Sequence, residues 1–453
     1  MGKRPLWQSV AGVKREVAAS LALGLVLLSL GGCGGGNNNA SSSKGCTGSV
    51  SGKFTLTAWY HSGRPEEVKE RQDEVDAFNK SQDKVTVVLK TLANGVDYNS
   101  QVQAAAASHQ LPDILDFDGP NIYNYAWNKA IQPIDSCISP SFKANLLQAA
   151  IDQATYAGRT WSVAEHQGSC GLYARKSILQ KNGIRIPTGP ADAWTKEEFT
   201  SILGTLKQAG YAHPLDLKMN YGKGEWLTFG FSPVIQSAGG DLIDRTHFQS
   251  ANGVLNGATS VQSLTIVQSW FKSGYVDPNT DDNAFVNRRT PISWVGAWEY
   301  SRYKKSAGDD LLVLPLPNFG QGSKAGNGSW SWAISSTAKN VDAAWQFINF
   351  SLQDPQQLNF AAAAGASPAT KSALAKDPLW AKGGDMYLYS ELLNGPYTVT
   401  RPQTPAYPTI TVAFANAFWN ISTGSDVKHE LDQAVATIDQ NIKDNQGYPP
   451  PSS

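Results

Sequence analysis

The first third of this chain alternates between segments typical of β-strands and segments typical of α-helices, and this alternation constrains the fold more than any other feature. The predicted strands are residues 54–60, 84–91 and 113–117, and the predicted helices are residues 65–80, 98–107 and 121–129. A helix that connects two strands of one sheet leaves them in parallel orientation. We therefore predict an α/β fold whose first sheet contains parallel strands.

Local signals mark where helices begin. Pro65 suits a first helical turn, and the acidic residues Glu66 and Glu67 favour the positive end of a helix. Thr195, followed three residues later by Glu198, has the pattern of a capping box. The second half of the chain also contains both kinds of element, with strands predicted at 291–297 and 311–316 and helices at 342–352 and 426–443.

Length and composition limit the classes of protein that this chain can belong to. The chain has 453 residues, which exceeds the usual size of a single core and predicts two lobes. Its 38 basic and 38 acidic residues balance, and no basic run marks a nucleic-acid surface. The 14 Trp, 16 Tyr and 16 Phe supply planar rings that can stack on flat faces such as those of sugars. Composition therefore argues against a nucleic-acid partner and favours stacking surfaces.

The N-terminal segment is typical of an exported protein. Basic residues at positions 3, 4, 14 and 15 precede an apolar run over 17–30, which is too short to span a membrane and predicts a signal peptide over 1–32. The sequence Leu30-Gly31-Gly32-Cys33 resembles a bacterial lipobox. We therefore expect lipidation of Cys33 with palmitate, a flexible tether over 33–53, and anchoring on the outer face of the cell membrane. The alternative is an ordinary secreted protein in which this cysteine is coincidental.

Three cysteines remain besides Cys33, and an exported domain places them in an oxidising environment. We predict a disulfide bond between Cys137 and Cys170, which leaves the role of Cys46 open. No cysteine or histidine spacing supports a metal site, so we expect neither a metal nor a cofactor.

Ordered segments along the chain resemble the extracellular solute-binding proteins of ABC sugar importers, the maltose-binding-protein-like group. The set begins with FTLTAWYHSG at 54–63 and LPDILDF at 111–117, and it ends with Pro368-Ala369. The other matching segments are residues 130–135, 158–163, 171–176, 182–184, 194–199, 237–240 and 294–298. Within 171–176 the chain has Ala-Arg where the family usually has Tyr-Asn. Each segment is weakly specific, but their common order extends over the chain from about residue 53.

This resemblance implies an α/β, two-lobe periplasmic-binding-protein-like fold of type II, with a hinge and an interlobe cleft. Lobe 1 is expected over 54–163 and 316–365, lobe 2 over 164–315 and 366–447, and a tail over 448–453. The hinge is expected near 161–164 and 314–317. A bond between Cys137 and Cys170 would lie near this hinge and limit its opening.

The resemblance also implies a function. It predicts an extracytoplasmic receptor, not an enzyme, that captures a mono- or oligosaccharide and delivers it to the transmembrane subunits of an ABC permease. We expect this receptor to be a monomer.

Sugars present hydroxyl groups and an apolar ring face, so their sites combine aromatic rings with carboxylate, amide and arginine groups. Trp298 ends a predicted strand, at the position where the family stacks a ring on sugar. Tyr407 lies in a proline-rich segment that resembles the family's C-terminal stacking region. The candidates expected in lobe 2 are Glu225, Trp226, Trp298, Glu299, Arg401 and Tyr407.

The remaining candidates follow predicted strands or lie near the hinge. At the end of the third strand we prefer Asp118 to Asp116 as the hydrogen-bond acceptor for hydroxyl groups. The glycine-rich loop 320–332 lacks the Gly-Lys-Ser/Thr ending of a phosphate loop, and the family brings such a loop to the cleft. The candidates in this group are His61, Ser62, Asp118, Glu165, Gln167, Ser329 and Trp330.

Two other classes of function remain open. An extracellular carbohydrate-active enzyme would need paired carboxylates, but no His-Glu-x-x-His or Gly-x-Ser-x-Gly motif occurs. A receptor for another solute, such as ferric iron, a peptide or a phosphorylated polyol, is the second alternative. The six scattered histidines argue against iron, whereas Arg64 and Arg401 keep a phosphate ester possible.

Overall fold

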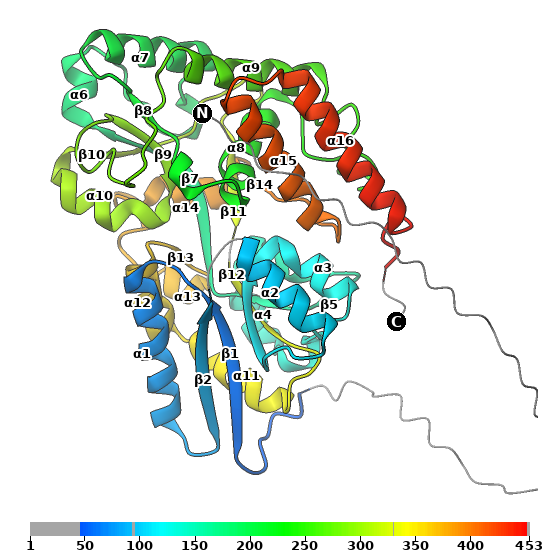
Figure 1. Ribbon diagram of the computed structural model, residues 1–453. Helices are drawn as coiled ribbons and strands as arrows, with labels where there is room; N and C mark the ends of the chain where they lie inside the picture. The colour runs from blue at the N-terminus through cyan, green and yellow to red at the C-terminus, as the bar shows by residue number, and fades with distance from the viewer. Residues whose placement is uncertain (1–45, 93–95, 329, 451–453) are drawn as a thin grey trace, which may run out of the picture. The chain divides into compact units, whose positions relative to one another are not determined.

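Five strands form the first sheet of the computed structural model, which describes residues 46–92, 96–328 and 330–450 (Figure 1). The order is β2-β1-β3-β12-β6; β1 is parallel to β2 and β3, and β12 is antiparallel to β3 and β6. The bounds are Phe54–His61 (β1), Val85–Leu92 (β2), Ile114–Asp118 (β3), Val163–Ala164 (β6) and Trp330–Ile334 (β12). The predicted parallel strands are therefore confirmed.

Helices cover both faces of this sheet because successive residues of a strand point to opposite sides. Ile114 packs in the core that α1 and α11 supply, whereas Leu115 and Phe117 pack in the core that α2 and α3 supply. The helices are α1 (Pro65–Ser81), α2 (Val96–Ala107), α3 (Ile122–Trp127), α11 (Val341–Ser351) and α12 (Asp354–Ala364). We call the sheet and these helices the first core region.

The second sheet is built around the long strand β7 (His166–Arg175). Its order is β14-β11-β7-β9-β8, and β10 and β13 also pair with β7. The other bounds are Leu215–Asp216 (β8), Ile292–Gly296 (β9), Leu311–Leu314 (β10), Ala325–Gly328 (β11), Ser367–Pro368 (β13) and Thr398–Thr400 (β14). β7 is antiparallel to all four of its partners, so this sheet departs from the parallel pattern of the first.

Amphipathic helices bury the second sheet and form the larger core with it. Thr195 caps α7 through the predicted capping box with Glu198. Helices α8 and α15 pack against each other, with Phe231 and Phe418 stacked at 4.4 Å between ring centroids. The main helices are α7 (Lys196–Gln208), α8 (Glu225–Ala238), α9 (Ala258–Lys272), α15 (Tyr407–Ser422) and α16 (Val427–Asp444). We call this sheet and its helices the second core region.

The chain crosses between the two core regions several times, and one of these crossings differs from its predicted position. One crossing lies between β6, which ends at Ala164, and β7, which begins at His166. The second crossing lies between β11, which ends at Gly328, and β12, which begins at Trp330, and not at 314–317. Leu316 and Phe319 explain the difference, because both side chains are buried in the second core region. A further crossing lies between Ala366, which is buried in the first core region, and Leu374, which packs against the second, and it includes β13.

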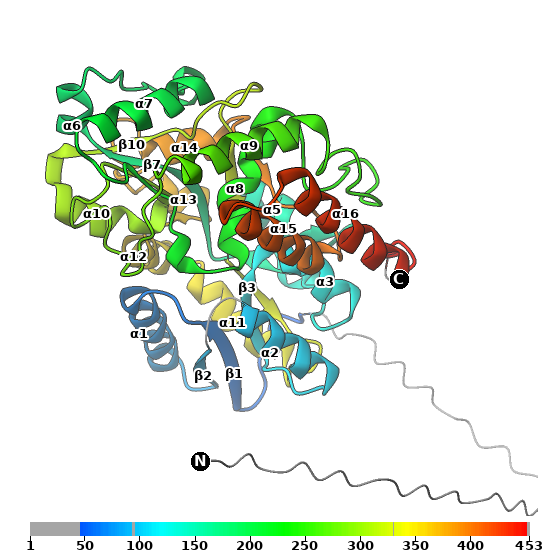
Figure 2. The same ribbon diagram turned by 45° about the horizontal axis from the view of Figure 1, so that its top comes forward.

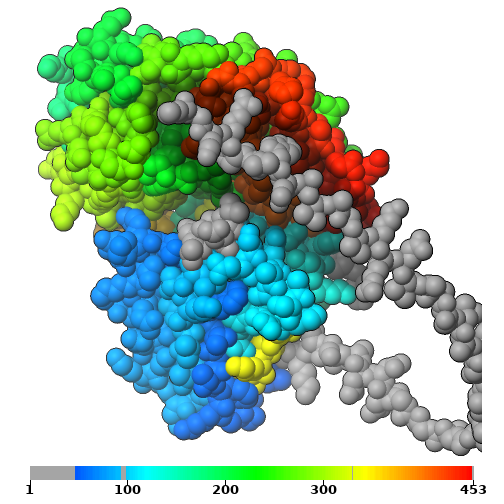
Figure 3. Space-filling model, viewed as in Figure 1, coloured from blue at the N-terminus to red at the C-terminus, as the bar shows by residue number. Residues whose placement is uncertain are grey.

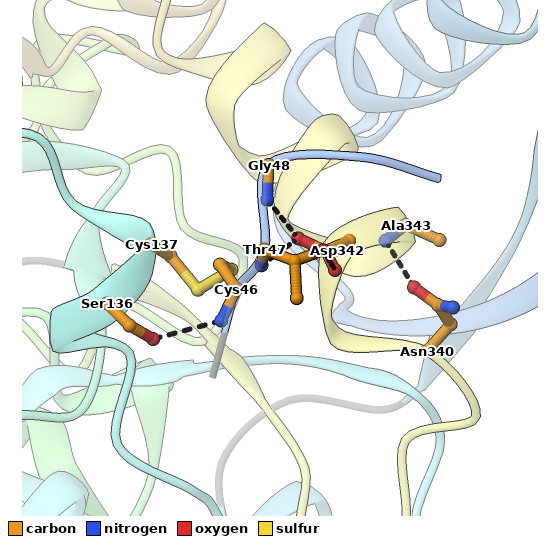
Figure 4. The surroundings of a disulfide bond; sticks show 8 residues. All are labelled: Cys46, Thr47, Gly48, Ser136, Cys137, Asn340, Asp342 and Ala343. Atoms are coloured by element: carbon orange, nitrogen blue, oxygen red, sulfur yellow. Dashed lines mark hydrogen bonds between the residues drawn. A yellow bond between two sulfur atoms is a disulfide. The ribbon is translucent and has the colours of Figure 1, made fainter. Parts of the chain in front are cut away.

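The predicted disulfide between Cys137 and Cys170 is wrong: Cys137 is bonded to Cys46, with 4.9 Å between their Cα atoms (Figure 4). Cys170 is a buried free thiol inside β7, whereas Cys137 ends a short 3-10 helix, Asp135–Cys137, of the first core region. Cys46 is held in place, since its amide donates to the Ser136 hydroxyl at 2.9 Å. The bond therefore lies within one core region and does not restrict the hinge.

The predicted signal peptide (1–32), the lipidation site Cys33 and most of the expected tether lie outside the described residues, as does Ser329. Among the helices in the described ranges, none is long and apolar enough to cross a membrane.

Candidate functional site

Three predicted site residues gather around the fourth, Arg401, which is 6% exposed. Its Nη2 donates to Oδ1 of Asp118 at 2.6 Å, and its Nη1 donates to Oε1 of Glu225 at 2.7 Å and also to Asp118. The Tyr407 hydroxyl donates to the same Glu225 oxygen. Asp118 ends β3 of the first core region, whereas Glu225 begins α8 and Tyr407 begins α15 in the second. The cluster thus joins the two core regions.

Burial and neighbouring charges shift the pKa values of two groups in this cluster, Glu225 and Arg401. Burial raises the pKa of Glu225, and the adjacent Arg401 opposes that rise. Burial would lower the pKa of Arg401, but Asp118 and Glu225 raise it well above its usual value. The side chains of Asp118 and Glu225 retain 15% and 26% exposure. Carboxylate oxygens in this setting can accept hydrogen bonds from hydroxyl groups of a ligand.

A cavity of about 10 Å³ lies next to this cluster, between Tyr123 and Asn327. It is large enough for one water molecule. Among the described residues, Oδ1 of Asn327 and Nε of Arg401 find no hydrogen-bond partner, and both residues line the cavity. The lining residues come from both core regions.

Trp298 and a neighbouring tyrosine form an aromatic surface on the second core region. Trp298 lies in the 3-10 helix Ala297–Glu299 that follows β9, and its Nε1 donates to the Tyr221 hydroxyl at 3.3 Å. Tyr221, which the sequence analysis missed, is 36% exposed. A Cβ atom on Gly296 would lie 1.9 Å from the Trp298 ring, so only glycine fits there. Tyr221 ends a short 3-10 helix before Gly222, a position that carried no recognisable motif.

Two other predicted residues, Trp226 and Glu299, are buried beneath the surface that Trp298 and Tyr221 form. Trp226 is buried, donates to the Leu217 carbonyl at 3.0 Å, and meets the Trp298 ring edge-on at 5.9 Å between centroids. Glu299 is buried and accepts hydrogen bonds from Arg302 at 2.8 Å and from Tyr221 at 3.3 Å. Burial raises the pKa of Glu299, and nearby cations oppose this rise. Neither residue offers a free surface to a ligand.

Phe229 connects the aromatic surface to the charged cluster. Its ring lies 6.1 Å from that of Trp298 and 5.0 Å from the guanidinium carbon of Arg401. Aromatic faces and a charged hydrogen-bonding group are therefore adjacent on the second core region. In the space-filling view the surface is recessed among the green atoms of this region (Figure 3).

In the first core region, His61 and Trp330 form a stacked pair, with 3.4 Å between ring centroids and 9° between planes. His61 ends β1 and is buried between two carboxylates, Asp116 at Nδ1 and Glu67 at Nε2, the latter 3.1 Å away. Burial alone would lower the pKa of His61, but Asp116 and Glu67 raise it to about 9. His61 is thus a buried cation that supports the partly exposed Trp330 ring. Asp116 therefore pairs with His61, whereas Asp118 pairs with Arg401 in the charged cluster.

Glu165 and Gln167 lie inside the protein at the first crossing. Glu165 is buried against Arg71, and burial raises its pKa although Arg71 opposes this. The Gln167 side chain has no exposure, and its side-chain amide group has no hydrogen-bond partner among the described residues. Ser62 remains partly exposed, and its amide donates to the Leu92 carbonyl at 2.7 Å. Glu165 and Gln167 are therefore not part of an accessible surface in this structure.

No group of His, Cys, Asp and Glu side chains within the described ranges has the geometry to hold a metal ion. The accessible chemistry of the site is instead aromatic rings beside hydrogen-bonding charged groups.

The sequence matches the family model described as bacterial extracellular solute-binding protein over residues 74–386, which is more than half of the chain. No relative was found among curated proteins.

Solved structures of binding proteins share the fold. The cyclic α-maltosyl-1,6-maltose binding protein of Arthrobacter globiformis is 22% identical, with a TM-score of 0.70, and the match covers 87% of this chain and 100% of that one. The GacH receptor of Streptomyces glaucescens is 19% identical, with a TM-score of 0.71 and coverage of 87% and 98%. The substrate-binding protein Lmo0181 of Listeria monocytogenes is 17% identical, with a TM-score of 0.73 and coverage of 86% and 99%. The predicted two-lobe α/β fold is confirmed.

Proposed function

This chain belongs to the family of bacterial extracellular solute-binding proteins, and we propose that it is a carbohydrate receptor that captures a mono- or oligosaccharide between its two lobes. The observation that carries this proposal is the adjacency of the Trp298 ring to Arg401 and its two carboxylates through Phe229. Aromatic faces suit the apolar side of a sugar ring, and the carboxylates suit its hydroxyl groups. The proteins with similar folds include ones whose structures hold acarbose and cycloalternan.

The charge of the cluster favours a neutral ligand over a phosphorylated one. Arg401 is surrounded by Asp118, Glu225 and the Tyr407 hydroxyl, so its charge is already compensated. A phosphate ester needs cations that are not paired with carboxylates. Hydroxyl groups, in contrast, can bridge such a pair without adding charge.

The remaining parts of the proposal concern delivery. We propose that the receptor acts as a monomer without catalysing a reaction, passes its sugar to an ABC permease, and is anchored by lipid at Cys33. The support for the anchor is the lipobox-like Leu30–Cys33 sequence. The lobes would correspond to the two core regions and would close about the crossings between β6 and β7 and between β11 and β12.

A thermal-shift screen of the purified chain against a panel of sugars tests this function. A sugar present at 100 times its Kd should add about 2.7 kcal/mol to the free energy of unfolding. Chromatography of that sugar after long incubation should return it unchanged, because a receptor does not transform its ligand. No shift with any sugar, together with a shift for another solute, would refute the carbohydrate class. A changed sugar would indicate an enzyme.

A further inference from the structure

The C-terminal residues Gln446–Pro449, which we call the strap, reach from the end of α16 to α3 of the first core region. Nε1 of Trp127, in α3, donates to the Pro449 carbonyl at 3.0 Å. The Trp127 ring also meets the Tyr448 ring edge-on, with 4.9 Å between centroids. Figures 1 and 2 both place the end of α16 beside α3. The tail of one core region therefore contacts the other.

The Trp127 side chain packs against the strap and not in the core of the first core region. Its neighbours Tyr123, Tyr125 and Ala126 are buried in the first core region, whereas Trp127 is only partly buried and belongs to none of the hydrophobic cores of the described residues. A tryptophan on a helix surface contributes little to stability unless something covers it. In this structure Tyr448 and Pro449 cover it.

The backbone of the strap adopts an uncommon conformation. Gln446, Gly447 and Tyr448 have φ values of 55°, 75° and 55°. Residues other than glycine rarely adopt positive φ, and this conformation persists only where surrounding contacts maintain it. The Tyr448 hydroxyl donates to Asn441 at 2.7 Å, and Gln249 donates to the Gly447 carbonyl at 3.0 Å. These bonds fix the strap to the second core region and turn its end toward α3.

We propose that the strap holds the two lobes together and limits their opening in the absence of ligand. Two other contacts between the lobes accompany the strap. The Asn124 side chain donates to the Pro405 carbonyl at 2.9 Å, and Asp118 forms an ion pair with Arg401. One hydrogen bond and one aromatic pair together change an equilibrium by about 5- to 150-fold. The strap would therefore decide the fraction of open receptor without contacting the ligand.

Truncation of the full chain tests this proposal. One variant ends at Gly447 and lacks Tyr448 and Pro449, and its matched control ends at Pro450 and keeps the strap. Spin labels on cysteines at the exposed positions Ser100 in α2 and Ala436 in α16 report the distance between the lobes by pulsed electron paramagnetic resonance. Without ligand, the shorter chain should show longer distances and about a 5- to 150-fold higher ratio of open to closed forms, whereas the control should match the parent.

A second, more conservative variant tests the same contact in case the truncated chain does not fold. Trp127→Phe keeps an aromatic ring and removes the donor to Pro449, so it should open the lobes by a smaller factor of roughly 2- to 10-fold. Identical distance distributions in the parent, the Gly447 truncation and Trp127→Phe would overturn the proposal. The measurement needs no ligand, so its result is independent of whether the solute is a sugar.

Discussion

Removal of the Cys46–Cys137 disulfide should destabilise the first core region strongly. The bond joins positions separated by 91 residues, and the loop includes β1, β2 and β3. On the chain-entropy estimate, a loop of this length stabilises the folded state by about 4–5 kcal/mol. Cys46 also positions Thr47 and Gly48, whose amides donate to Oδ1 of Asp342 at 2.8 and 2.9 Å. Loss of the bond should therefore also free this segment from α11.

The assay is urea unfolding of the parent and of the Cys46→Ser/Cys137→Ser variant, monitored by fluorescence. We expect the midpoint of the transition that reports the first core region to fall by an amount equivalent to about 4–5 kcal/mol. Cys170→Ala is the matched control, because this buried thiol has no disulfide partner and its loss should cost about 1 kcal/mol. Non-reducing peptide mapping should recover Cys46 linked to Cys137. Recovery of a Cys137–Cys170 peptide, or an unchanged midpoint in the double variant, would refute the reasoning.

Three further predictions concern the ligand, the anchor and pH. Trp298→Ala should weaken sugar binding in calorimetry by about 5- to 150-fold while the melting transition stays cooperative, and Trp298→Phe should retain part of the affinity; unfolding of the alanine variant would place this ring in the core. Cys33→Ser should release the protein from the membrane fraction, and retention after a high-salt wash would argue against a lipid anchor. The raised pKa of His61 stabilises the fold fully below pH 6.5, and this contribution, on the order of 3 kcal/mol, is lost as the pH rises through about 9. The free energy of unfolding should thus fall between pH 6.5 and 9 more steeply in the parent than in His61→Gln, and equal slopes would contradict the buried ion pair.

Short-range patterns in the sequence were sufficient to predict the local structure. Strands 54–60, 84–91 and 113–117 appear as β1, β2 and β3 within about two residues, and the Thr195 capping box forms. Hydrophobic periodicity and helix caps act over a few residues, so they can be read without knowledge of the fold. The ordered family motifs similarly identified the two-lobe fold, which depends on many weak signals and not on one contact.

Contacts between distant residues were decided only by the tertiary structure. Asp118 and Arg401 were each recognised as candidates, but their pairing across 283 positions could not be deduced. The sequence equally allowed Cys137 to pair with Cys170, and only the tertiary structure places Cys46 beside Cys137 and Cys170 in the other core region. Glu165 and Gln167 have the chemistry of sugar ligands, yet the fold encloses both. Residue type and local pattern determine what a side chain can bind, whereas packing between the two core regions determines which groups it meets and whether a solute can reach it.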